Sequence, residues 1–380
     1  MRQAVLGSAH EPEVTAAIIA AGVGVLTLAA TVVTQISGRR ATSRDTQQAL
    51  KEQREQLNTT LAAQREQLDK TLTEQRTRTF NERFATAAGQ LGSDKPPDVR
   101  LAGVYAMAGL ADDWEKNRQT CVDVLCAYLR MPYEPHPGQD APRPERLAFR
   151  ASREVRHTVI RVITAHLKED ATVSWQGLNF DFTGVVFDGG DFAGTKFSGG
   201  DVYFYGAEFS GGMVNFQDAE FSGSRVTFYA AKFSSGEVWF NGAKFSSGEV
   251  SFMTAKFSAG KVHFSVEFSG GLVVFNLAEF SGGTVDFSHA LFSGGTVDLT
   301  SAHFSGGKVD FAGTKFFSGK VDFSGATFSG GSVDFRDAES SGGELNFGGV
   351  SDWSFPPAFP WTDTSPPGVK LPKKEDQSQA

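Results

Sequence analysis

From about residue 200 onward the sequence repeats every twelve residues. Within each repeat a Phe is followed five residues later by a Val, and a second Phe follows that Val by two. Plain five-residue steps precede this pattern, between Phe182 and Val202. Neither the 3.6-residue period of a helix nor the long alternation of an ordinary strand fits this spacing. A fixed long period instead predicts a solenoid, in which stacked units bury one continuous core.

The Val and the Phe two residues after it fall on one face of a short extended segment, so both side chains point to the same side. Gly and Ser fill the steps between these segments, as tight turns require. We therefore expect the Phe and Val positions to form the core, each buried Phe contributing about 1.5–3 kcal/mol. The expected core positions of the most regular part are Phe209, Val214, Phe216, Phe221, Val226, Phe228, Phe233, Val238, Phe240 and Phe245.

The frame A-x-F-S-G, seen in AGTKFSGG, GAEFSGG, GAKFSSG and GATFSGG, resembles that of the pentapeptide-repeat proteins. The resemblance covers roughly residues 175–353 and implies that four repeats form one square coil of a right-handed β-helix. This sequence departs from the family pattern by adding two residues at every second step. We therefore expect a mainly β fold over residues 171–353, a right-handed quadrilateral β-helix with about 24 residues per coil.

Residues 14–36 contain no charged side chain and predict a transmembrane helix. As a helix they would span about 34 Å, enough to cross the hydrocarbon core of a bilayer. A cleaved signal peptide is the alternative, but the apolar stretch is long for one. Arg residues follow the span between positions 39 and 44, which favours a cytoplasmic location for the rest of the chain. We expect a single-pass protein of the cell membrane with a short N-terminal tail, residues 1–13.

Residues 37–78 predict a helical stalk with an eleven-residue repeat, KEQREQLNTTL followed by AAQREQLDKTL. Eleven residues in three turns favour a straight or slightly right-handed coiled coil. One interpretation is therefore a homo-oligomer that associates through the stalk, and the other is a single solvated helix. The apolar stripe consists of Leu50, Leu57, Leu61, Leu68 and Leu72.

Residues 79–170 have the pattern of a small helical module, interrupted by Gly92 and by a Pro-rich loop at 132–144. The stretch RFATAAGQLGSDKPPDVRLAGVYAMAGLA resembles the helical segment between anchor and repeats in membrane-anchored bacterial pentapeptide-repeat proteins. We expect this module to cap the first coil, whose open end is otherwise an exposed sheet edge. Residues 354–380 predict a C-terminal cap and a disordered tail. The aromatic side chains expected in that cap are Trp353, Phe355 and Trp361.

No motif in the sequence indicates catalysis, a cofactor or a metal. The spacing of Cys121 and Cys126 matches no zinc pattern, so we expect two core residues of a helix. His157 and His166 lack further ligands at suitable spacing. Ser is abundant, but it occupies the F-S-G-G turn and no nucleophile elbow is present. We therefore expect a protein that is not an enzyme and needs no cofactor or metal.

A row of Asp residues occupies the outward position between Val and Phe in the later repeats. In a coil of about 24 residues they form two rows on opposite faces, with neighbours in one row ~4.8 Å apart. Lys308 and Lys320, two positions before an Asp, are expected to reduce the repulsion between carboxylates. A solvated charged face is one interpretation and a docking surface the other. The candidate interaction surface comprises Asp286, Asp298, Asp310, Asp322 and Asp334.

These features together favour a non-enzymatic, membrane-anchored scaffold that presents the solenoid to a protein partner, whose identity the sequence leaves open. The alternative comes from members of the resembled family that imitate DNA: an inhibitor of a DNA-processing enzyme such as a topoisomerase. A third interpretation is a sensor whose Arg-rich helix touches anionic lipid or nucleic acid. Residues 175–353 hold 20 acidic and 10 basic side chains. This moderate excess and the membrane anchor make nucleic acid, or an enzyme that binds it, a poor expected partner.

Overall fold

The computed structural model describes residues 43–134, 136–361 and 365–372. The predicted transmembrane segment, residues 14–36, lies outside these ranges. Within them, no helix combines the length and the hydrophobicity needed to cross a membrane. Contacts divide the chain between Thr77 and Arg78, and the parts on either side are described separately.

Before Arg78 the described chain is one helix, the first part of α2 (Ser43–Gln90). This part of α2, before Arg78, contains no Gly or Pro and is rich in Gln, Glu, Leu and Arg, which favour a helix. Leu side chains of the eleven-residue repeat lie on its surface. The exposed fractions are 47% for Leu50, 42% for Leu57, 54% for Leu68 and 40% for Leu72.

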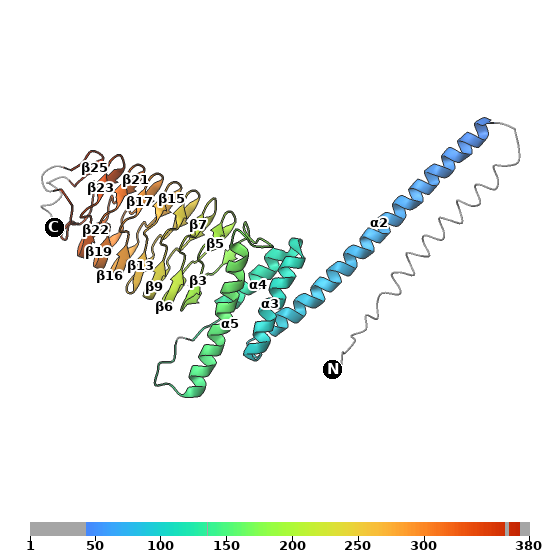
Figure 1. Cartoon of the computed structure of the whole chain (residues 1–380), viewed down its shortest axis with the longest axis horizontal. Coiled ribbons are helices and arrows are strands. Elements are labelled where there is room, and N and C mark those ends of the chain that lie inside the picture. Colours follow the sequence, from blue (N-terminus) through green and yellow to red (C-terminus); the bar gives the residue numbers. More distant parts are fainter. Residues whose placement is uncertain (1–42, 135, 362–364, 373–380) are drawn as a thin grey trace. The chain divides into compact units, whose positions relative to one another are not determined.

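From Arg78 on, the end of α2 joins a helical module. The helices that follow are α3 (Pro97–Asp113), the 3-10 turn η1 (Glu115–Asn117), α4 (Arg118–Arg130) and α5 (Arg143–Leu167). Their buried faces share one core with the first coils of the solenoid. Cys121 and Cys126 are buried there as free thiols, as their apolar surroundings predict. Figure 1 shows α4 and α5 beside the first strands of the solenoid.

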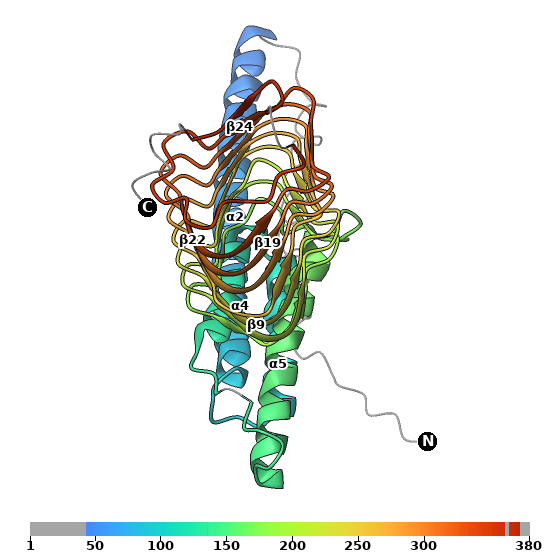
Figure 2. The same cartoon turned by 90° about the vertical axis from the view of Figure 1, so that its left-hand side faces the viewer.

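The rest of the chain is a parallel β-solenoid of about 8 turns, built from three sheets. Seen from its C-terminal end in Figure 2, the coils lie one behind another. Sheet 1 contains β1 (Phe180–Asp181), β5 (Asp201–Tyr203), β8 (Arg225–Thr227), β11 (Glu249–Ser251), β15 (Leu272–Val274), β18 (Thr296–Asp298), β21 (Lys320–Asp322), β24 (Glu344–Asn346) and β25 (Val369–Lys370). Sheet 2 contains β2 (Val186–Phe187), β3 (Gly190–Asp191), β6 (Glu208–Asn215), β9 (Lys232–Trp239), β12 (Lys256–Phe257), β13 (Lys261–His263), β16 (Glu279–Asp286), β19 (His303–Asp310) and β22 (Thr327–Asp334). Sheet 3 contains β4 (Lys196–Phe197), β7 (Glu220–Phe221), β10 (Lys244–Phe245), β14 (Glu267–Phe268), β17 (Leu291–Phe292), β20 (Lys315–Phe316) and β23 (Glu339–Ser340).

Strand register gives the coil length directly. Phe221 pairs with Phe245 and Val214 with Val238, in both cases 24 residues apart. Phe245 pairs with Phe268, only 23 residues on, because one residue is missing from the repeat there. The sequence prediction of a solenoid with about 24 residues per coil is therefore confirmed.

The number of sheets differs from the four faces expected of a square coil. In sheet 2, strands such as β6 run through two of the expected inward positions, Phe209 and Val214, in eight residues. The backbone passes the Gly-Gly step between them with a shift of register instead of a separate turn. Because Gly lacks a Cβ, the strand bends there without a steric conflict, and two expected faces join in one sheet.

The ten expected core positions are all buried, none more than 2% exposed. Their rings stack from coil to coil with nearly parallel planes. Phe216 and Phe240, for example, have ring centroids 4.9 Å apart and an interplanar angle of 5°. The spacing matches that of the paired strands, so each Phe of these ten positions has a Phe neighbour in the coil above and in the coil below.

The C-terminal end differs in part from the expectation. Trp353 packs against Phe328 and Phe347, as an end cap requires. Phe355 is 55% exposed and covers little of the last coil, while Phe359 stacks on Phe335 instead. The tail was expected to be disordered, yet its β25 pairs with β24 and extends sheet 1 by one strand. Pairing satisfies backbone groups that the last coil would otherwise leave open.

Candidate interaction surfaces

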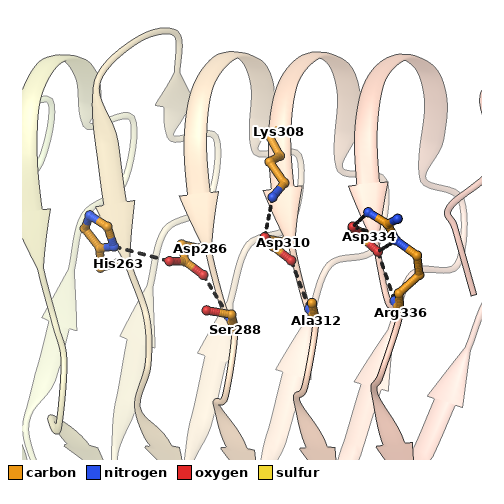
Figure 3. A network of polar contacts seen from close by, with 8 residues as sticks. All are labelled: His263, Asp286, Ser288, Lys308, Asp310, Ala312, Asp334 and Arg336. Carbon is orange, nitrogen blue, oxygen red and sulfur yellow. Dashed lines mark hydrogen bonds and ion pairs between the residues drawn. The ribbon is translucent and has the colours of Figure 1, made fainter. Parts of the chain in front are cut away.

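Three of the five expected surface carboxylates form one row on sheet 2. Asp286 lies beside Asp310, and Asp310 beside Asp334, at the same register position of adjacent strands (Figure 3). The other two, Asp298 and Asp322, form a second row on sheet 1, which continues to Asn346. The structure therefore brings the five residues together as two separate rows.

Each of these carboxylates closes a local turn, because it accepts a hydrogen bond from the backbone N–H two residues later in the sequence. The Oδ1 atom of Asp286 accepts the backbone N–H of Ser288 at 2.9 Å, and Asp310 does the same for Ala312 at 3.0 Å (Figure 3). Asp298, Asp322 and Asp334 accept the N–H two residues later in the same way. Such a side-chain turn is a general property of Asp, Asn, Ser and Thr. The Asp rows thus have a structural role at the corner of the coil.

The second carboxylate oxygen is also occupied along the sheet 2 row. His263 lies 3.3 Å from Asp286, Lys308 2.5 Å from Asp310, and Arg336 2.5 Å from Asp334 (Figure 3). The side chains of the three Asp are only 25%, 15% and 9% exposed, in the same order. The hydrogen bond from the Arg336 guanidinium lowers the pKa of Asp334 below its usual range. Lys308 and Arg336 therefore balance the charge of two of the three carboxylates, and a ring nitrogen of His263 contacts the third.

In the sheet 1 row, Lys320 pairs with Asp322 at 2.6 Å. Burial alone would raise the pKa of Asp322, but hydrogen bonds from Lys320 and Ser324 outweigh it and lower the pKa. The expected neutralising role of Lys308 and Lys320 is thus present in both rows.

A signal for the turn role was present in the sequence. The same position in earlier repeats holds Asn215, Thr227 and Ser251, none of which carries the negative charge of Asp. All three accept the backbone N–H two residues later. These residue types share an oxygen that can close a local turn, and Asp uses its oxygen in the same way. Trp239, His263 and Val274 occupy the position in other coils, so the oxygen is a recurrent feature of the position and not a strict requirement.

A different surface, which sequence reasoning missed, lies at the start of sheet 1. Tyr205 and Tyr229 occupy equivalent positions of successive coils and stack with ring centroids 5.2 Å apart and an angle of 4°. Tyr205 is 50% exposed. Next to them Tyr203 donates to Asp201, which also pairs with Arg225 at 3.4 Å. The fragments DVYFYG and RVTFYA carried the signal, because Tyr recurs at twelve-residue multiples there.

In the first coil of the solenoid, Asp188 connects the repeats to the helical module. Its carboxylate accepts from Arg153 Nε at 2.9 Å and Tyr133 OH at 2.8 Å, and lies 3.0 Å from His157 Nε2. Burial would raise the pKa of Asp188, but hydrogen bonds from His157 and Tyr133 and the charge of Arg153 lower it to about 2. The module is thus fastened to the solenoid by an ionised carboxylate.

A second polar contact of the same kind involves Asp112 on α3. The carboxylate accepts from Trp175 Nε1 at 2.9 Å and lies 3.1 Å from His166 Nε2. The His166 and Trp175 rings stack at 3.9 Å. His157 and His166, both on α5, therefore serve the junction between module and solenoid. Within the part of the chain that the structure describes, no cluster of three His, Cys, Asp or Glu side chains could hold a metal ion.

Comparison with protein-family models, with curated proteins and with solved structures finds no match to this chain. The class that the fold defines is a Phe-rich parallel β-solenoid with an N-terminal helical module.

Proposed function

We propose that this protein is a non-enzymatic, membrane-anchored scaffold of the pentapeptide-repeat type, with a right-handed coil and residues 14–36 as its anchor. The A-x-F-S-G frame and the stacked Phe core support the repeat type. One observation carries the function: the carboxylates of the two Asp rows close local turns, and most of them form ion pairs as well. The rings of Tyr205 and Tyr229, in contrast, stack at the surface. Partner binding is therefore assigned to the tyrosines and not to the Asp rows.

Physical arguments favour the tyrosines as a docking site. A Tyr side chain offers a large, rigid contact area, and interfaces are enriched in it. Stacking already fixes both rings, so little side-chain entropy is lost on binding. Asp201 and Arg225 beside them can supply polar contacts at the rim.

Affinity capture from solubilised membranes tests this assignment. Full-length protein should retain a specific partner, and the double variant Tyr205→Ser, Tyr229→Ser should lose it. Lys232→Ser, which removes an exposed side chain on sheet 2, is the control and should retain the partner. Equal capture by all three proteins would remove the tyrosines from the proposal.

The membrane anchor has its own test. Epitope tags at the two termini of the full chain should differ in protease access on intact cells. A single pass with the solenoid in the cytoplasm predicts digestion of the N-terminal tag alone. Digestion of the C-terminal tag alone would reverse the orientation, and protection of both tags would argue against the span.

The DNA-mimic alternative loses its main support, because Lys308 and Arg336 balance two of the three carboxylates in the row that would imitate phosphates. Its test is an inhibition assay of DNA supercoiling with the purified protein. Asn closes the same turn as Asp, so replacing Asp286, Asp310 and Asp334 with Asn removes charge and keeps the fold. We expect no inhibition by either protein. Salt-sensitive inhibition that the Asn variant lacks would restore the alternative.

A further inference from the structure

A small cavity of about 70 Å³ opens at the surface of the helical module, between the loop at Ser93, the start of α3, the end of α4 with the segment after it, and the middle of α5. Ser93, Met131 and Pro132 at its rim are exposed. This is several times the roughly 10–15 Å³ that one water molecule needs. No Asp or Glu lines the cavity. Its polar side chains are Ser93, Arg100, Tyr128, Ser152 and Arg156, with the ring of Tyr133 as one wall.

Arg100 is not fully paired. Its Nη1 atom donates to the hydroxyl of Tyr128 at 3.2 Å, and that hydroxyl carries a proton of its own. Its Nε atom is buried and has no hydrogen-bond partner. Across the described ranges no carboxylate lies within ion-pair distance of this guanidinium, so its charge is not compensated.

Arg156 is the second guanidinium, and only 5% of the residue is exposed. It donates to two backbone carbonyl groups, Leu129 O at 2.7 Å and Val186 O at 2.9 Å. Its Cζ atom lies 4.1 Å from the ring centroid of Tyr133. Burial lowers the pKa of Arg156 from its ordinary value. The charge of Asp188 also acts on Arg156, but no ion pair joins the two side chains. A buried guanidinium without a contacting anion is costly, and an anion in the cavity would reduce that cost.

The nearest acidic side chain on the packed elements, Asp188, does not fill that role. It is already bonded to Arg153, His157 and Tyr133, and it is not part of the cavity wall. Two guanidinium groups and three hydroxyl groups therefore surround a space whose wall contains no anionic group.

We propose that this cavity binds a single phosphate-type oxyanion, either free phosphate or the phosphoryl group of a small monoester. Guanidinium groups match the oxygens of such an anion, and hydroxyl donors complete its shell. Arg100 supplies the free Nε–H and Arg156 the buried positive charge. The anion would join α3, α4 and α5, which carry these groups, and so stabilise the module that contacts the first coil.

The test uses the full-length protein and inorganic phosphate, with chloride at equal ionic strength as the reference. Phosphate should raise the unfolding temperature saturably, by roughly 2–8 °C at a large excess over its Kd. Arg100→Gln should abolish this rise. Arg150→Gln, an exposed residue of α5 outside the cavity, should keep it.

Broadening of the phosphate phosphorus NMR line gives a direct readout that does not depend on unfolding, and Ser152→Ala is a milder second variant that should weaken it. Glycerol phosphate distinguishes the two sources, because it binds only if the cavity admits a monoester. A rise of equal size in the wild type and Arg100→Gln would mean a general salt effect and would overturn the proposal. Absence of both the rise and the broadening in the wild type would do the same.

Discussion

Phe221 and Phe245 stack directly on one another across the coil repeat, with ring centroids 4.9 Å apart and planes 7° from parallel. They are also paired residues of β7 and β10, so ring stacking and strand pairing have the same spacing. Phe245 continues the column to Phe268 at 5.3 Å. A change at one position therefore affects two neighbouring coils.

Phe245→Ala should lower the free energy of unfolding by about 3–5 kcal/mol, because it leaves a cavity between two stacked rings. Phe245→Asp should cost more, since it buries a charge without a partner. Phe355→Ala is the control, because Phe355 is 55% exposed and should cost little. Urea unfolding followed by circular dichroism measures all three. An unchanged midpoint for Phe245→Asp would show that the side chain does not point inward.

Ser340→Phe should stabilise the C-terminal end. Ser340 pairs with Phe316 where every other strand of sheet 3 presents a Phe, and its hydroxyl oxygen is buried without a partner. A Phe extends the column by one ring and removes the unsatisfied hydroxyl, for a gain of about 1–2 kcal/mol. Thermal unfolding of the two proteins measures the gain. A lower melting temperature would mean that the end of the solenoid has no room for the ring.

Thr254→Gly should stabilise the protein by about 1–2 kcal/mol. Thr254 has φ +54°, which a β-branched residue rarely adopts, and its hydroxyl is buried without a partner. Gly206 has φ +58° at the equivalent turn, four repeats of twelve earlier, with open space where a Cβ would lie. Gly206→Thr should therefore destabilise by a similar amount. Chemical unfolding checks both, and changes of the same sign in the pair would contradict the explanation.

Asp188→Asn should make stability less dependent on pH in acid. The pKa of Asp188 is lowered to about 2 in the folded protein, against about 3.9 in an unfolded chain. Its contribution is therefore complete above about pH 4 and is lost as the pH falls toward 2. Over that range the wild type should lose about 1–2 kcal/mol more than Asp188→Asn. Asp140→Asn, an exposed loop variant, should follow the wild type, and parallel curves for all three would exclude this role.

Leu57→Cys should form disulfide-linked dimers of the full-length protein under mild oxidation. Leu57 belongs to the exposed Leu stripe of α2, and a parallel pair of stalks would bring the two copies of this residue together. Thr59→Cys lies on the opposite side of the helix and should remain monomeric, and the native thiols are buried. Non-reducing gel electrophoresis reads the result. Equal crosslinking at both positions would favour the single solvated helix.

The repeat itself made the solenoid predictable. A Phe or Val every five or seven residues has only one way to become buried, and the column through Phe209 and Phe233 follows from it. The coil length followed for the same reason. The joining of two expected faces in the single strand β6 could not be predicted from the repeat, because a Gly-Gly step is compatible with both a turn and a bent strand.

The junction could not be predicted, because it has no period. Asp188 meets Tyr133 and His157 from 55 and 31 residues away, and the sequence contains no pattern that links them. The turn role of the Asp rows was predictable from the sequence. Asn215 and Thr227 in the same position share with Asp an oxygen that can close a local turn, and they do not share its charge.

Because successive coils pair in the same register, the number of coils can change while the contacts at the two ends of the solenoid stay the same. Loss of residues 222–245 would join Phe221 to Ser246 and leave the spacing of the inward Phe and Val positions unchanged. The stack would shorten by one strand spacing, ~4.8 Å, while the helical module and the C-terminal cap kept their own neighbours. Evolution can thus adjust the distance between the two ends in whole coils without redesigning either.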